Sequence, residues 1–234
     1  MEKHTVSASL TDNTKYMNRA LPVKKSFDII ERNLIIGGQN SAFYFIDGFT
    51  KDETMLKLMD SFLNISADDM PEDATSFSTS CIPYVEVDIL GDFDSIFKNL
   101  LSGVTCLFID GYEAAIAIDC RTYPSRSIEE PDKDKSLRGS RDGFVETIVF
   151  NTALMRRRIR DPHLIMEMYE AGTSTRTDVA LCYMSDRVDR ELLTTIQNKL
   201  EDKMAEEILE GKIHRGDRVI VSVSKKVIKF SVND

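Results

Sequence analysis

A charged, turn-rich stretch with few apolar residues divides this chain near its middle. Residues 125–142 adjoin or contain two prolines, Pro124 and Pro131, and carry mixed charges with little that a core could bury. Such a composition is typical of a connector between folded parts and not of a buried helix or strand. Because one core commonly serves about 100 to 150 residues, we expect two lobes, one on each side of this stretch.

The composition is that of an ordinary globular protein, with 42% hydrophobic and 29% charged residues among 234. The net charge of -9 argues against a protein devoted to nucleic acid, which usually needs a basic surface. The chain has no run of about 18 apolar residues, and its first twenty residues lack the apolar core of a secretory signal. We therefore expect a soluble chain that is not exported.

The cysteines point to a reducing, cytosolic setting. They show no CxxC or CxxH spacing, and with three histidines in the chain a zinc site is not expected. We expect buried, reduced thiols and no metal or cofactor. The four are Cys81, Cys106, Cys120 and Cys182.

The first lobe is expected to be a small α/β subdomain over residues 23–122, preceded by a flexible or helical lead-in over residues 1–22. Residues 27–36 and 41–48 are rich in Ile, Phe and Tyr and predict two strands, with the Gly37–Asn40 segment as the turn between them.

Two further patterns belong to this lobe. Met55, Leu56, Met59 and Phe62 recur at helical spacing and predict a helix over residues 51–63, with its methionines in the core. A hairpin follows around Asp110 and Gly111, for which we expect Leu107 to face Ala114.

The second lobe is expected to be another small α/β subdomain over residues 144–200, joined to the first by the connector 123–143. Its first helix has an apolar stripe that we expect to be buried, formed by Phe144, Ile148, Thr152, Met155 and Ile159. Strands over 163–169 and 178–184 and a helix from about 188 follow. Residues 201–234 predict a helix and a β-hairpin tail. The fold class is thus α/β (α+β), with two mixed subdomains.

Arginines crowd the connector and the end of this helix. Between Tyr123 and Arg160 nine Lys or Arg stand against six Asp or Glu, which gives +3 and leaves -12 for the remainder. A helix dipole needs only one or two such cations. The others suggest either an Arg/Glu clamp that fixes the angle between the lobes or a contact with another subunit. The residues concerned are Arg126, Glu129, Glu130, Arg138, Arg141, Arg156, Arg157, Arg158 and Arg160.

The amino-acid sequence of this region resembles that of the GerA family of spore germination proteins. The resemblance rests on YPSRS followed by EEP, on RGSRDGFVE, and on NTAL followed by RRRIR, which together span Tyr123 to Arg160. With fewer matching positions, the resemblance extends from about Phe27 to Asn198. Residues 200–234, in contrast, resemble the C-terminal end of Clp-type ATPases, although the chain has no Walker A sequence.

The resemblance implies a non-enzymatic region of two α/β subdomains on the spore-core side of the inner membrane. It also implies partner subunits of a germination or sporulation membrane complex, with possible self-association, and a membrane contact only through a portion absent from this sequence. The expected role is assembly and signal transmission.

Two other functions compete with this hypothesis. The arginine cluster could make the chain an anion- or nucleic-acid-binding module, although no aromatic residues are interleaved with the arginines for base stacking. An enzyme is disfavoured because no histidine lies in a recognisable triad or metal pattern, so we expect no catalytic residues.

Overall fold

The computed structural model describes residues 4–82, 85–122, 144–145, 147–171, 176–194, 196, 210–212, 218–224 and 227–233. Its helices are α1 (Leu10–Ala20), α2 (Asp52–Leu63), α3 (Ala74–Cys81), α4 (Phe93–Leu101) and α5 (Ile148–Arg158), with a short 3-10 turn at Ala67–Asp69. Its strands are β1 (Ile29–Ile36), β2 (Gln39–Ile46), β3 (Val87–Leu90), β4 (Thr105–Ile109), β5 (Ala115–Ile118), β6 (Leu164–Ala171), β7 (Thr177–Met184), β8 (Arg218–Ser224) and β9 (Val227–Asn233).

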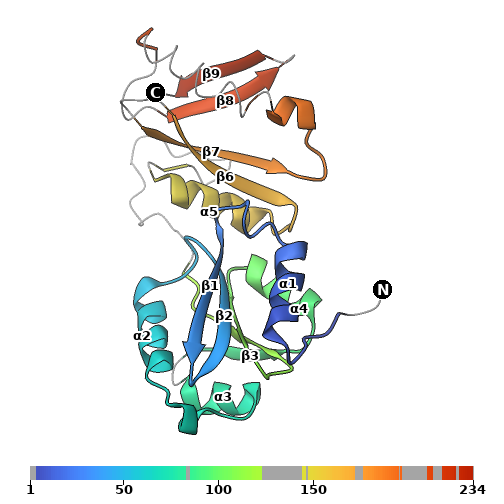
Figure 1. The fold of residues 1–234 in the computed structure, drawn as a ribbon. Helices are drawn as coiled ribbons and strands as arrows, with labels where there is room; N and C mark the ends of the chain where they lie inside the picture. Colours follow the sequence, from blue (N-terminus) through green and yellow to red (C-terminus); the bar gives the residue numbers. More distant parts are fainter. Residues whose placement is uncertain are drawn as a thin grey trace, which may run out of the picture.

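The first part of the chain is a three-layer sandwich around an antiparallel sheet with the order β1-β2-β4-β5-β3. Helices α1 and α4 cover one face of this sheet, and α2 and α3 cover the other (Figure 1). Strands β4 and β5 are buried along their whole length because both faces are covered. The fold class is therefore α+β, as the sequence predicted.

The β1–β2 hairpin closes through two glycines. Ile36 pairs with Gln39, which leaves Gly37 and Gly38 as the central residues, with φ of 52° and 78°. Positive φ at both positions defines the type I′ geometry that matches the twist of paired strands. The predicted turn is confirmed, but it is tighter than expected, since β2 already begins at Gln39.

The lead-in expected over residues 1–22 includes helix α1. Ser9 caps this helix by accepting a hydrogen bond from the Asp12 amide. Met17 and Leu21 are buried in the core that α1 shares with α4 and the sheet. The helical alternative is thus the one observed for residues 10–20, and this helix is part of the sandwich.

Two details of the first lobe differ from the sequence patterns. Leu56 is exposed, because Met59 and Phe62 form the buried stripe of α2 and Leu56 lies about 100° away around the helix. In the β4–β5 hairpin, Leu107 pairs with Ile116 and not with Ala114. The turn is longer because Asp110 bonds to other elements, donating its amide to Asn40 and accepting from the amide of Leu10.

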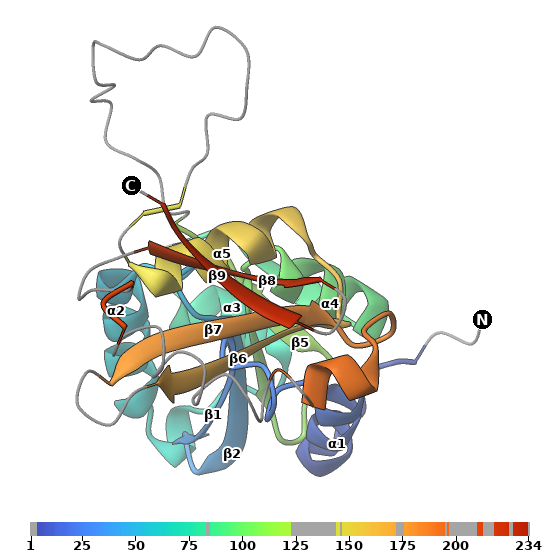
Figure 2. The same cartoon turned by 90° about the horizontal axis from the view of Figure 1, so that it is seen from above.

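The second part consists of α5 and the antiparallel β6–β7 hairpin, and Figure 2 shows α5 running along this small sheet. Strands β8 and β9 form a separate hairpin in which Ser224 pairs with Val227, as predicted for the tail. The small sheet is tied to the first part through the backbone, where Phe27 donates its amide to the carbonyl of Met166 at 2.9 Å. The division into subdomains at residues 123–143 stays a prediction.

Helix α5 buries only part of the predicted stripe. Thr152 is buried as predicted, but Phe144 and Ile159 are exposed, and Ala153 and Arg156 complete the buried face. The helix begins only at Ile148 because the side-chain amide of Asn151 bonds both the N–H and the C=O of Val145, each at 2.7 Å.

A glycine substitution tests the packing of the first core. Gly103 has a φ of 98°, and a Cβ there would lie 2.6 Å from Cδ2 of buried Phe49. We expect Gly103→Ala to lower the free energy of unfolding by about 2–4 kcal/mol, from backbone strain and overpacking together. The measurement is urea denaturation followed by circular dichroism.

Two other glycines separate these causes. Gly111 has a φ of 92° but open space around it, so Gly111→Ala should cost only the strain of about 1–2 kcal/mol. Gly91 has neither constraint, and Gly91→Ala should leave stability within about 1 kcal/mol. Equal effects at Gly103 and Gly111 would contradict the packing argument.

Candidate functional site

Arg156 is a fully buried cation at the junction of the two parts, with an exposed fraction of 0%. Its Nε donates to Oδ2 of Asp28 at 2.7 Å, and its Nη2 donates to Oδ1 of the same carboxylate at 3.2 Å. Nη2 also donates to the carbonyl of Leu164 at 2.9 Å, and Nη1 to the carbonyl of Asp161 at 3.0 Å. The guanidinium therefore joins α5 to the segment before β1 and to the start of β6.

The position of this arginine follows from how α5 packs. A Cβ on Gly48 would lie 3.1 Å from Cβ of Ala153, so two small residues let the helix lie close to the turn after β2. Arg156 follows Ala153 by three residues and lies on the same side of the helix. It also belongs to the last turn of α5, where a cation offsets the negative end of the helix dipole.

Ser26 completes the network around the ion pair. Its hydroxyl donates to Oδ1 of Asp28 and accepts the backbone amide of Met166 at 2.9 Å. Both Ser26 and Asp28 are buried. Taking two charges out of water is expensive, and their attraction offsets this cost only when further hydrogen bonds satisfy the remaining polar atoms. Ser26 and the two carbonyls supply those bonds.

A second, more exposed contact lies beside this pair. Lys25 Nζ lies 3.6 Å from Oε1 of Glu167 and 5.4 Å from the ring centre of Tyr183, whose hydroxyl donates to the same carboxylate oxygen at 3.0 Å. The hydrogen bond with Tyr183 raises the pKa of Lys25 above its usual value. Because the side chain of Lys25 is half exposed, we expect this contact to add little stability.

The predicted arginines have different environments. Arg156 is buried against Asp28, whereas Arg157, Arg158 and Arg160 are exposed. The remaining predicted residues, Arg126, Glu129, Glu130, Arg138 and Arg141, lie outside the described residues. The clamp and partner-contact hypotheses for this set thus stay predictions.

Sequence reasoning missed Asp28 and Ser26. The signal was an ionisable residue in an otherwise apolar run, Phe27-Asp28-Ile29-Ile30, at the start of a predicted strand. A carboxylate in such a place is seldom buried without a partner. A search for its cation would have led to the arginine cluster, although not to Arg156 in particular.

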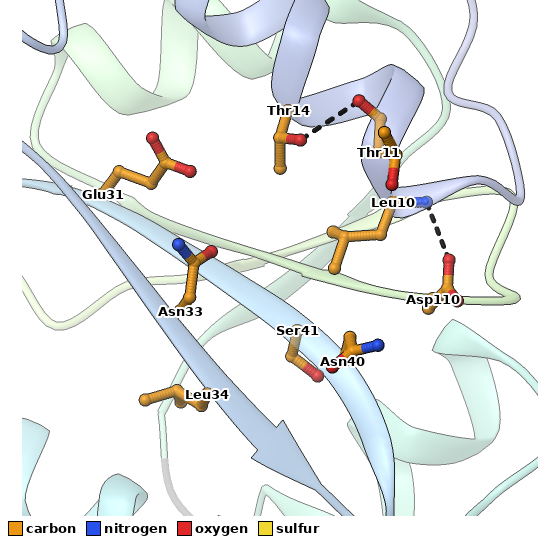
Figure 3. Close-up of a pocket in the computed structure, with 9 residues that line it drawn as sticks. All are labelled: Leu10, Thr11, Thr14, Glu31, Asn33, Leu34, Asn40, Ser41 and Asp110. Carbon is orange, nitrogen blue, oxygen red and sulfur yellow. Dashed lines mark hydrogen bonds between the residues drawn. The ribbon is translucent and has the colours of Figure 1, made fainter.

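A polar depression of about 300 Å³ lies between α1 and the edge of the large sheet (Figure 3). Figure 3 shows Thr11 and Thr14 on α1 above Glu31 and Asn33 on β1, with Asp110 at the far end. Its nine lining residues include no Lys or Arg, so it offers no ion pair to an anionic ligand. Asp110 already accepts the amide of Leu10 at 2.9 Å.

The described residues contain no group of three or more His, Cys, Asp or Glu side chains placed to hold a metal ion. Burial raises the pKa of the thiols of Cys106, Cys120 and Cys182 to about 12, 11 and 11. At neutral pH these thiols are protonated and therefore poor nucleophiles. All four cysteines are free; Cys106 and Cys120 are buried as expected, whereas Cys81 and Cys182 are only partly buried.

No helix in the described part of the chain is both long and apolar enough to cross a bilayer. Fold and site together define an α+β module in which a buried ion pair lies where the large sheet meets the β6–β7 sheet. A match to a family model identifies the sequence family. A family model described as "Bacillus/Clostridium GerA spore germination protein" matches residues 15–215, and the chain belongs to this family.

Two relatives from Bacillus subtilis (strain 168) illustrate the similarity. Stage V sporulation protein AF is 32% identical over 200 residues, which cover 85% of this chain and 41% of the relative. Spore germination protein KA is 29% identical over 210 residues, covering 88% of this chain and 38% of the relative. The chain thus spans about two fifths of the length of these relatives.

A solved structure shows the same fold. The N-terminal domain of the A subunit of the Bacillus megaterium spore germinant receptor GerK3 superposes with a TM-score of 0.68 at 19% sequence identity. The match covers 95% of this chain and 86% of that domain. Neither comparison supports the resemblance of residues 200–234 to a Clp-type ATPase, because the family match runs on to residue 215 and the structural match covers nearly the whole chain.

The ion pair can be tested by removing one partner. Arg156→Met leaves the Asp28 carboxylate buried without its cation, so we expect the free energy of unfolding to fall by about 3–5 kcal/mol in urea denaturation. Combined with Asp28→Asn, the loss should be smaller than the sum of the single losses by about 0.5–3 kcal/mol.

Arg157→Met is the matched control, because Arg157 is the exposed neighbour on the same helix. It should change stability by less than about 1 kcal/mol. A similar small change for Arg156→Met would show that the buried pair does not hold the two parts together.

Proposed function

We propose that this chain acts without catalysis in a spore germination or sporulation membrane complex, where it assembles with partner subunits and transmits a signal toward a membrane-spanning portion. The names of the relatives support the setting, since one is a sporulation protein and another a spore germination protein. A location on the cytoplasmic, spore-core face of the inner membrane is part of the proposal.

One observation carries the signalling part. The continuous segment from Ser26 to Ile36 bonds to both sheets, first to β6 and Arg156 through Ser26, Phe27 and Asp28, and then to β2 as strand β1. A displacement of β6 or α5 therefore acts on the edge strand of the large sheet without an intervening loop. Such a direct mechanical link suits a domain that passes a change from one part to the other.

The outer face of α5 supports the assembly part. It carries exposed Phe150 and, seven residues later, exposed Arg157, followed by Arg158. Residues seven apart lie on the same side of a helix. Aromatic residues and arginine are enriched at protein interfaces, and the planar guanidinium recognises carboxylates bidentately. The partner face is thus expected to present acidic side chains.

Charge reversal on this face tests the assembly role in the full-length protein. We expect Arg157→Glu together with Arg158→Glu to abolish co-purification of the other subunits from solubilised spore membranes and to slow germination. The thermal unfolding midpoint of the isolated 234-residue chain should change little, because both side chains are exposed.

A matched variant makes the same change of charge elsewhere. Arg187→Glu with Arg190→Glu alters two exposed arginines outside α5 and should leave assembly intact. If the α5 variant assembled and folded like the wild type, the docking role would be wrong. Loss of folding alone would instead favour a clamp between the lobes.

A further inference from the structure

Two of the three most exposed large apolar side chains of the described residues lie on α2, away from α5. The three are Leu56 at 69%, Ile35 at 64% and Leu63 at 60%. Leu56 and Leu63 lie on α2, whereas Ile35 lies on β1 and faces away from α2, because its neighbour Ile36 packs in the core that α2 covers. Figures 1 and 2 show α2 on the opposite side of the large sheet from α1 and α4. Single exposed leucines need no explanation, but two on one stripe of a helix mark a candidate interaction surface.

The exposed stripe of α2 alternates acidic and apolar residues. Glu53, Leu56, Asp60 and Leu63 follow one another at spacings of three and four and lie within ~80° around the helix. All four are exposed. This spacing of three and four is the one by which a second helix packs along a first. The opposite side of α2 is already buried against the sheet through Met59 and Phe62.

The negative charge of this surface is not explained by interactions within the fold. Asp60 lies in the last part of α2, where the helix dipole disfavours a negative charge, and the last turn contains no basic residue. Residues 52–73 carry seven acidic residues against one lysine, a net charge of -6, and all seven are exposed. Asp52 and Glu53 suit the helix start and Asp73 caps α3, but Asp60 has no such role. A cationic partner would remove this unfavourable term.

We propose that the α2 surface, formed by Glu53, Leu56, Asp60 and Leu63, is a docking site for a basic amphipathic helix of a partner protein. Its apolar side chains would pack on Leu56 and Leu63, and its Lys or Arg side chains would pair with Glu53 and Asp60. This surface is distinct from the outer face of α5, which is basic and takes acidic partners. The domain then has two docking faces of opposite charge.

The test uses the purified chain and a designed helical peptide of three heptads, with Leu in the core positions and Lys in the flanking positions. Its partner peptide has Glu in place of every Lys. Fluorescence anisotropy at low salt should show binding of the Lys peptide but not of the Glu peptide. Binding should weaken when salt is raised to about 0.5 M, because exposed charges are screened.

Substitutions on α2 sharpen the result. Leu56→Ser and Leu63→Ser should each weaken binding of the Lys peptide by about tenfold or more, as expected for apolar anchors at an interface. Asp60→Lys should weaken the Lys peptide and favour the Glu peptide instead. Ile89→Ser is the control, since Ile89 is exposed on β3 and not on α2. Every position is exposed, so thermal unfolding should confirm that the variants fold.

Several outcomes would overturn the proposal. They are no measurable binding of the Lys peptide, equal binding of both peptides, or binding that the Leu63→Ser variant retains. A molar mass of the chain alone that rises with concentration and falls to the monomer in Leu63→Ser would assign the surface to a second copy of this chain. The variant with Arg157→Glu and Arg158→Glu should bind the Lys peptide as the wild type does, because both substitutions lie on α5. If the wild type does not bind the Lys peptide, the α2 proposal is wrong, but the assembly role proposed for α5 is not affected.

Discussion

The buried pair of Arg156 and Asp28 is the interaction around which the large sheet and the β6–β7 sheet meet. It is the point where α5, the segment before β1 and the start of β6 meet, and each contributes a charged group, a hydroxyl or a carbonyl. The surrounding hydrogen bonds are directional, so they are satisfied only when all three elements are in place. Close packing of Ala153 against Gly48 holds α5 at the distance at which the guanidinium can reach Asp28.

Neighbouring arginines of one helix therefore have unrelated roles. A step of one residue turns a side chain by about 100°, which takes Arg156 into the junction and Arg157 into solvent. The sequence showed the cluster but could not show this division, because the buried stripe of α5 was assigned to its apolar residues. Phe144 and Ile159 are exposed instead, and a cation occupies the centre of the buried face. Apolar periodicity predicts a buried face on the assumption that buried positions hold apolar residues, and a buried ion pair does not meet this assumption.

Much of the fold could be predicted, since most strands and helices of the first lobe follow from local patterns such as the Gly37–Gly38 turn and the buried run of β4. What could not be predicted are long-range choices. The register of the β4–β5 hairpin depends on hydrogen bonds from Asp110 to Leu10 and Asn40. The ion-pair partner of Asp28 is Arg156, which lies 128 positions away in the sequence. Secondary structure is predicted from short segments of sequence, and such segments do not include these distant partners.

A polar junction also behaves differently from an apolar one when it is displaced. Apolar side chains can slide over one another and still exclude water, because the hydrophobic effect has no direction. The bonds from Arg156 to the carbonyl of Leu164 and from Met166 to Ser26 have no such freedom, since a shift of one residue would leave buried polar groups unpaired. The junction therefore either holds in one register or opens, and this all-or-none behaviour is what the proposed signalling role would require.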